Sequence, residues 1–522
     1  MTAIERARAL LGKSGSLAAV NGDREYSSSA RGVKPLTNLL CSDREMLRGA
    51  SVADKIVGKA AALLMAAGGV KEVYAGTIGR AAAKVFERFG IKFSYGNVTE
   101  HIKNRAGNGM CPMEQTVRYV DDPADAEIAI RRTQKVLTAR AERGEKMKKL
   151  GFGMMRLPVK GGQNDIDLEQ VSEMVDTFLQ RGFEYFDTAW MYHEHMSEIA
   201  VRECLVKRYP RESFKLATKL PAFMLKSADE MMPTFEKRCE KCGVDYFDYY
   251  LIHNINAENY CNQVQKFDAF GFVKKLKEQG RIRHYGFSFH DTADVLDKIL
   301  CDHPDAEFVQ LQINYLDWDS DRVQSGKCWE VARKHGKPVI VMEPVKGGTL
   351  AKVPAQAEGL LKAVHPDMSV PSWAVRFAAG LDGVFMVLSG MSDIGQLKDN
   401  TSFMSDFRPL DENELQTVKK AASVIKGTGA IACTACRYCT ENCPTDIPIP
   451  DYFGLYNSGI LAGKSQNKAG YEEIAAGHGR ASDCVARAKG TAPSTLKYAA
   501  CLKKLQKNTN KLFLIKAFAA RL

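Results

Sequence analysis

Between residues 149 and 409, short runs rich in β-forming residues alternate with amphipathic stretches of helical period. This alternation is typical of repeated βα units around a parallel sheet. Eight strands in about 260 residues match the size of a (β/α)8 barrel, in which catalytic groups lie at the C-terminal ends of the strands. The predicted strands are 150–154, 184–187, 214–218, 246–251, 283–287, 308–313, 338–342 and 384–388.

The 522 residues exceed what one ordinary core holds, and the length favours about three domains. A charged helical stretch, DDPADAEIAIRRTQKVLTARAERGEKMK, separates the barrel from what precedes it. We therefore predict an α/β protein in five parts. These are an N-terminal α/β domain at 1–120, a linker at 121–148, the barrel at 149–410, a mostly helical cysteine-bearing domain at 411–486 and a basic tail at 487–522.

Four polar residues fall at or just after the predicted ends of the second, third and fourth strands. They are Asp187, Tyr192, Lys219 and His253. Taken singly, each has an ordinary alternative, as a helix cap, a packed aromatic, a solvated strand end or a core histidine. Together they fit carbonyl reduction, in which a phenol with a pKa lowered by a nearby cation protonates the oxygen. We expect Asp187 to pair with Lys219, and His253 to orient the substrate oxygen or to share in the proton relay.

The motifs FDTAxxY, ATK and LIHN resemble those of the aldo/keto reductase superfamily over about residues 148–410. The resemblance implies the catalytic set Asp187, Tyr192, Lys219 and His253. It also implies a nicotinamide dinucleotide, NAD(P)H, with glycine-rich loops near its pyrophosphate. The residues implied for cofactor binding are Ser288, Gln310, Asn314, Glu343, Lys346, Gly347, Gly348, Ser389, Gly390, Gln396 and Asn400.

Two departures from that family bear on specificity. Members that use NADP usually place Lys or Arg after the last strand, where this chain has Met391-Ser392-Asp393. We therefore doubt a preference for NADP. Position 193, often glycine in the family, is His193, and we expect this histidine to reshape the substrate mouth together with its neighbours Glu194 and His195.

Near the C-terminal end, Cys433, Cys436, Cys439 and Cys443 followed by proline have the bacterial ferredoxin spacing of a 4Fe-4S cluster. In related two-run modules a second cysteine run follows, and the fourth cysteine of each run ligates the other cluster. Here that second run stops at Cys484. Cys443 is therefore the default fourth ligand of the first cluster, with Cys484 and Cys501 as alternatives.

We hypothesise that the sequence beyond about residue 486 is an out-of-frame reading of the gene. A back-translation of 487–507 with freely chosen codons, read in another frame, restores the missing cysteines and a CPQH motif. Residues 461–522 hold 12 Lys and Arg against 3 Asp and Glu, or 12 − 3 = +9 of the net charge of +11. We interpret this charge as a solvated tail and expect no nucleic-acid partner. Resequencing the 3′ end of the gene tests the hypothesis.

The N-terminal segment resembles a small family of unknown function with a fold similar to cytidine deaminases. The residues that carry the resemblance are GVKPL at 32–36, ADKIVGK at 53–59, Asn104-Arg105 and CPME at 111–114. Zinc deaminases need His-x-Glu and Pro-Cys-x-x-Cys motifs. Here Asp54-Lys55 stands in place of the first, and Cys111 has no second cysteine nearby. We expect a ligand-binding or scaffolding role without catalytic zinc.

We expect a cytoplasmic oxidoreductase that interconverts a carbonyl and an alcohol and passes electrons through a 4Fe-4S cluster. The cysteine run needs free thiolates, and neither a signal peptide nor a membrane-length apolar stretch is evident. The expected partner is a small molecule, and a redox partner protein stays open. Two alternatives remain, a flavin- or ferredoxin-coupled reductase and a non-catalytic redox sensor that binds a nucleotide.

Overall fold

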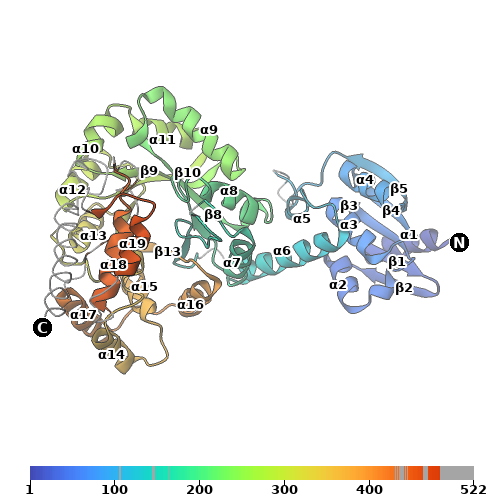
Figure 1. Cartoon of the computed structure of the whole chain (residues 1–522). Helices are drawn as coiled ribbons and strands as arrows, with labels where there is room; N and C mark the ends of the chain where they lie inside the picture. The colour runs from blue at the N-terminus through green and yellow to red at the C-terminus, as the bar shows by residue number, and fades with distance from the viewer. Residues whose placement is uncertain are drawn as a thin grey trace, which may run out of the picture.

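The computed structural model describes most of residues 1–481 (Figure 1). The residues outside the description are 105, 106, 108, 144–146, 163, 322, 429, 430, 432, 434–439, 441, 442, 444, 462–467 and 482–522. A long helix, α6 (Pro123–Arg143), runs between an N-terminal α/β unit and the barrel. The predicted domain boundaries stay predictions.

The N-terminal unit is built on a five-stranded sheet in the order β2-β1-β3-β4-β5. The pairs β1–β2 and β1–β3 are antiparallel, whereas β3, β4 and β5 run parallel. Its strands are β1 (Leu17–Asn21), β2 (Arg24–Ser28), β3 (Ser51–Val57), β4 (Glu72–Gly79) and β5 (Lys92–Thr99). Its helices are α1 (Ala3–Ser14), α2 (Lys34–Ser42), α3 (Lys59–Gly68), α4 (Arg80–Arg88) and α5 (Pro112–Thr116).

Eight parallel strands close into a barrel in chain order, which confirms the predicted (β/α)8 fold. Each predicted strand overlaps one of them. Their buried valine, isoleucine, leucine and phenylalanine side chains fill the interior and pack against the surrounding helices. The strands are β6 (Leu150–Gly153), β7 (Tyr185–Asp187), β8 (Lys215–Leu220), β9 (Phe247–Ile255), β10 (Ile282–Phe289), β11 (Phe308–Gln312), β12 (Val339–Met342) and β13 (Val384–Gly390).

Helices surround the barrel, as expected for βα units (Figure 1). The α-helices of this layer are α7 (Leu168–Gln180), α8 (Ser197–Val201), α9 (Met231–Cys242), α10 (Ala257–Asn259), α11 (Ala269–Glu278), α12 (Ala293–Asp302), α13 (Ser325–Lys334), α14 (Ala355–Val364), α15 (Val370–Gly380) and α16 (Ile394–Ser405). Three more follow, α17 (Glu412–Gly427), α18 (Ile449–Leu461) and α19 (Lys468–Ala475). Among the described residues, no helix combines the length and apolar character needed to cross a membrane.

Helix α6 contacts both units, because it packs on α3 of the first and α7 of the second. On α6 itself, Arg132 lies 3.6 Å from Asp176 of α7. The N-terminal unit also contacts the barrel directly, because the Gln115 side chain accepts a hydrogen bond from the Arg211 amide at 3.0 Å. Arg211 precedes β8, so the N-terminal unit meets the barrel near the beginning of a strand. The catalytic residues are expected at the other ends of the strands.

Asp54 lies buried in β3, only 7% exposed, and accepts a hydrogen bond from the Ile56 amide at 2.9 Å. Burial raises the pKa of this carboxyl to about 7. The folded chain therefore holds the Asp54 proton more tightly than the unfolded chain, in which the pKa is near 3.8. Its contribution to stability is complete below that value and is lost as the pH rises through 7.

Ionisation of Asp54 should lower the folding stability of the wild-type chain as the pH rises from about 4 to about 7. We expect Asp54→Asn to lack this loss of stability. Thermal unfolding of the full chain, followed by circular dichroism across this range, measures the effect. Asp23→Asn is the matched control, because Asp23 is exposed in the turn between β1 and β2. A wild-type pH profile retained by Asp54→Asn would contradict the interpretation.

Candidate active site

Three of the four predicted catalytic side chains meet at the C-terminal ends of neighbouring strands. Asp187 is the last residue of β7, Tyr192 lies in the loop that follows, and Lys219 lies near the end of β8. The Lys219 ammonium is 2.5 Å from Asp187 Oδ1 and 3.3 Å from the Tyr192 hydroxyl. It also donates to the Thr188 carbonyl at 2.9 Å. One buried cation therefore links the carboxylate to the phenol.

The Asp187–Lys219 pair is almost completely removed from solvent, at 2% and 1% exposure. Burial raises the pKa of Asp187 and lowers that of Lys219, and the attraction between the two groups opposes both shifts. A cation held this close to a phenol favours the phenolate and so eases loss of its proton. The arrangement is suited to proton transfer at Tyr192.

The fourth predicted catalytic residue, His253, lies near the end of β9 and is 3% exposed. Its ring meets that of Tyr192 edge-on, with the centroids 6.4 Å apart, and it also contacts Phe223. Burial, followed by the charges of Lys219 and His290, holds the pKa of His253 well below its usual value. The imidazole is therefore neutral near pH 7 and can hydrogen-bond to a ligand without adding charge.

The turn after Tyr192 has an unusual backbone. His193, Glu194 and His195 have φ values of 52°, 50° and 74°, in the left-handed region that non-glycine residues rarely adopt. His193 is buried and accepts a hydrogen bond from the Leu157 amide at 2.9 Å, while His195 stacks on Trp190 with the ring centroids 4.5 Å apart. Both histidines hold the strained turn in place, and such strain is concentrated at functional sites.

Two of the predicted cofactor residues are neighbours across β10 and β11, where Ser288 pairs with Gln310. The Ser288 hydroxyl accepts a hydrogen bond from the Asn254 amide at 2.7 Å. Gln310 is 2% exposed, and its side-chain oxygen has no hydrogen-bond partner among the described residues. A buried acceptor without a donor is costly. This atom is suited to receive an N–H group from a ligand.

A second group of predicted cofactor residues is tied together at the ends of β11 and β12. The Lys346 ammonium contacts Asp317, whose carboxylate also accepts a hydrogen bond from the Asn314 amide group at 2.9 Å. Glu343 lies 3.5 Å from Arg156. Gly347 and Gly348 follow Lys346 and have φ values of 62° and 97°, which produce a tight turn. This turn is the glycine-rich loop that we expect from the sequence near the pyrophosphate.

The remaining predicted cofactor residues follow β13. Asn400 donates a hydrogen bond to the Ser389 hydroxyl at 2.9 Å, which fixes α16 against the end of the strand at Gly390. Asp393 caps α16 by accepting hydrogen bonds from the amide and side chain of Gln396, at 2.8 and 2.7 Å. A carboxylate therefore sits at the N-terminus of this helix.

A model described as the aldo/keto reductase family matches residues 149–423. The chain belongs to the aldo/keto reductase family. A probable aldo-keto reductase 1 from Glycine max is 30% identical over 187 residues, which cover 34% of this chain and 51% of that protein. The chain spans about half the length of the first curated relatives that it matches.

Solved structures match two parts of the chain separately. An aldo/keto reductase from Klebsiella pneumoniae, described as in complex with NADP and acetate, is 20% identical and covers 52% of this chain and 91% of its own, with a TM-score of 0.43.

A domain of unknown function (DUF1893) matches residues 6–133. A DUF1893 protein from Thermotoga maritima is 31% identical over 24% of this chain and 87% of its own, with a TM-score of 0.23. The likeness to deaminases stays a prediction.

A second buried ion pair lies behind Lys219, and sequence reasoning missed it. Glu198 on α8 pairs with Arg238 on α9 at 3.1 Å, and both are at most 1% exposed. Glu198 accepts a hydrogen bond from Thr218, the residue before Lys219, at 3.0 Å, and Arg238 lies over Trp190. Burial raises the pKa of Glu198 to about 7. In sequence both residues belong to charged helical stretches, which gave no signal of burial.

Of the four predicted cluster ligands, the description includes Cys433 and Cys443, whereas Cys436 and Cys439 lie outside it. Both described cysteines pack against a small apolar cluster that includes Ile447 and Phe453. The Cys443 sulfur accepts a hydrogen bond from the Ile447 amide at 3.3 Å. Hydrogen bonds to the ligand sulfurs are among the features that tune iron–sulfur clusters.

Proposed function

We propose that this chain is an NAD(P)-dependent oxidoreductase that interconverts a small carbonyl compound and its alcohol. The observation that carries the proposal is the Lys219 ammonium, which lies 2.5 Å from Asp187 and 3.3 Å from the Tyr192 hydroxyl. A phenol beside a buried cation can deliver a proton to a carbonyl oxygen at neutral pH. In the reverse direction the same phenolate accepts the proton of the alcohol.

Each catalytic residue has a distinct role in this proposal. Tyr192 donates the proton, and Lys219 stabilises the phenolate that remains. Asp187 holds Lys219 in place and keeps it charged. His253 is neutral and orients the substrate oxygen with a hydrogen bond, a role that the low pKa of its buried imidazole supports. When bound, the nicotinamide supplies or accepts the hydride.

The unpartnered Gln310 oxygen supports a nicotinamide site at β10 and β11, because a carboxamide N–H could satisfy it. Ser288 and Asn314 belong to the same proposed site. The turn at Gly347 and Gly348 would place backbone amides near the pyrophosphate. The other predicted contacts are Glu343, Lys346, Ser389, Gly390, Gln396 and Asn400.

The direct test is a steady-state screen of aldehydes, ketones and sugars with NADH and NADPH, followed by absorbance. We expect turnover with at least one class of carbonyl. Dinucleotide binding without turnover across the whole panel would favour the alternative of a redox sensor.

We expect NADH to be preferred over NADPH by about tenfold in kcat/KM, a difference of about 1.4 kcal/mol. By the family resemblance, the start of α16 would face the 2′ position of the adenosine ribose. Asp393 places a negative charge there, where a 2′-phosphate needs a cation. Asp393→Ser retains a helix-capping oxygen and removes the negative charge. This variant should therefore show a smaller preference for NADH over NADPH in kcat/KM. An unchanged ratio in this variant would exclude Asp393 as the determinant.

We further propose that the cysteine run at 433–443 holds a 4Fe-4S cluster coupled to the barrel, in a reducing compartment such as the cytoplasm. The ferredoxin spacing and the amide hydrogen bond to Cys443 support it. Iron, sulfide, flavin and nicotinamide should be quantified on one anaerobic preparation. Four iron and four sulfide per chain without flavin fit the proposal. Bound flavin would favour the flavin-coupled alternative, and a preparation without iron would refute the cluster.

A further inference from the structure

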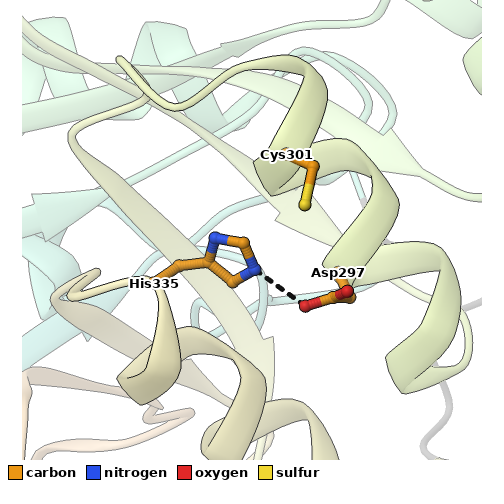
Figure 2. Close-up of side chains that lie close together, drawn as sticks. All are labelled: Asp297, Cys301 and His335. Atoms are coloured by element: carbon orange, nitrogen blue, oxygen red, sulfur yellow. Dashed lines mark hydrogen bonds and ion pairs between the residues drawn. The ribbon is translucent and has the colours of Figure 1, made fainter.

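Three side chains with metal-binding atoms converge on the outside of the barrel. Asp297 and Cys301 lie one turn apart on α12, and His335 directly follows α13. Figure 2 shows all three pointing into the space between the two helices, with the Cys301 sulfur directed toward the imidazole and carboxylate. One ligand atom from each residue lies within 4.8 Å of those of the other two.

We propose that Asp297, Cys301 and His335 form a zinc site that joins α12 to α13. A thiolate, an imidazole and a carboxylate are the three protein ligand types that zinc prefers, at about 2.0 to 2.3 Å from the ion. Ligands at these lengths around a tetrahedral ion lie about 3.5 Å from one another. Small side-chain rotations bring the three atoms to this spacing, and water completes the fourth position.

The local charges are compatible with a cation. The His335 and Lys334 nitrogens lie 2.8 and 3.0 Å from the same Asp297 oxygen. A zinc ion bound to Asp297 would replace the contacts that this oxygen makes with His335 and Lys334. The Lys334 side chain is 69% exposed and can turn into solvent, so its displacement is inexpensive.

The site lies apart from the catalytic end of the barrel. His335 precedes β12, which begins at Val339, whereas Asp187 and Lys219 lie at or near the C-terminal ends of their strands. Zinc at this position would therefore bridge two outer helices. The proposal is independent of the function assigned to the barrel.

The test is a titration of the full, chelator-treated chain with zinc chloride in competition with a chromophoric chelator. We expect Cys301→Ser and His335→Gln each to weaken binding at this site by at least about tenfold. Cys261→Ser is the matched control, because Cys261 is also exposed and lies outside the group. Lys334→Met should tighten binding, because it removes the competing ammonium. The cysteine run at 433–443 is unchanged in every variant. Zinc bound by that run therefore contributes equally to all the titrations and does not affect the comparison.

Cobalt provides a second measurement that reports the ligand itself. Binding of Co²⁺ should give thiolate-to-cobalt charge-transfer absorbance that is weaker in Cys301→Ser than in the wild-type chain and unchanged in Cys261→Ser, since the run at 433–443 contributes equally in all three. Equal zinc affinity and stoichiometry in Cys301→Ser and the wild type, or equal cobalt spectra, would overturn the proposal. Because Cys301 is exposed, its replacement by serine leaves the core unchanged.

Discussion

Tyr192→Phe is expected to abolish turnover while dinucleotide binding survives. The phenol lies 3.3 Å from the Lys219 ammonium and carries the proton proposed for the substrate, and phenylalanine retains the ring but not that proton. Loss of a general acid typically costs about 10² to 10⁴ in rate. We expect kcat to fall at least by this factor. Steady-state kinetics measures it, and dinucleotide affinity from fluorescence titration should be unchanged.

Tyr185→Phe is the matched control for this experiment. Tyr185 is fully buried in β7, the strand before the loop that carries Tyr192, and its hydroxyl has no hydrogen-bond partner among the described residues. Removing that hydroxyl should therefore leave kcat near the wild-type value. Normal turnover in Tyr192→Phe would remove Tyr192 from the mechanism.

Lys219→Met is expected to cost about 3 to 5 kcal/mol of folding stability as well as activity. Methionine fills similar volume but leaves the Asp187 carboxylate buried without its cationic partner. The pKa of Asp187, already raised by burial, then rises further. Because the folded state binds this proton more tightly than the unfolded state, the loss should be larger at pH 8 than at pH 5. Urea unfolding followed by tryptophan fluorescence measures both values.

The double variant Lys219→Met with Asp187→Leu separates a buried charge from lost packing. Replacing both members of a buried ion pair with apolar residues is often nearly neutral for stability. We expect the double variant to recover most of the stability but none of the activity. A double variant as unstable as Lys219→Met would show that packing, rather than the uncompensated carboxylate, accounts for the loss.

Local sequence was sufficient to predict the barrel, because each strand is a short apolar run set off by amphipathic helical stretches. The eight strands found overlap the eight expected. The same pattern indicated where Asp187 and Lys219 would meet, since the C-terminal ends of parallel strands share one end of a barrel. Their contact at 2.5 Å agrees with the predicted pairing.

Other features of the site had no local signal. Glu198 and Arg238 appear in sequence as charged helical residues, and only the packing of α8 and α9 on the barrel buries them as a pair. Asp317 likewise gains its role from contact with Lys346, which is distant in sequence. Contacts of this kind depend on loop paths that sequence periodicity does not encode.

The sequence alone thus determined the order of strands and helices and the residue types at the strand ends, because both are expressed in short segments. The tertiary structure decided which charges are buried together. It also decided the left-handed turn from His193 to His195 and the approach of Cys301 on α12 to His335 at the end of α13. The ion pairs and the approach of Cys301 to His335 arise when segments far apart in the chain are brought into contact, and the desolvation that shifts the pKa values of the buried charges exists only in the folded barrel.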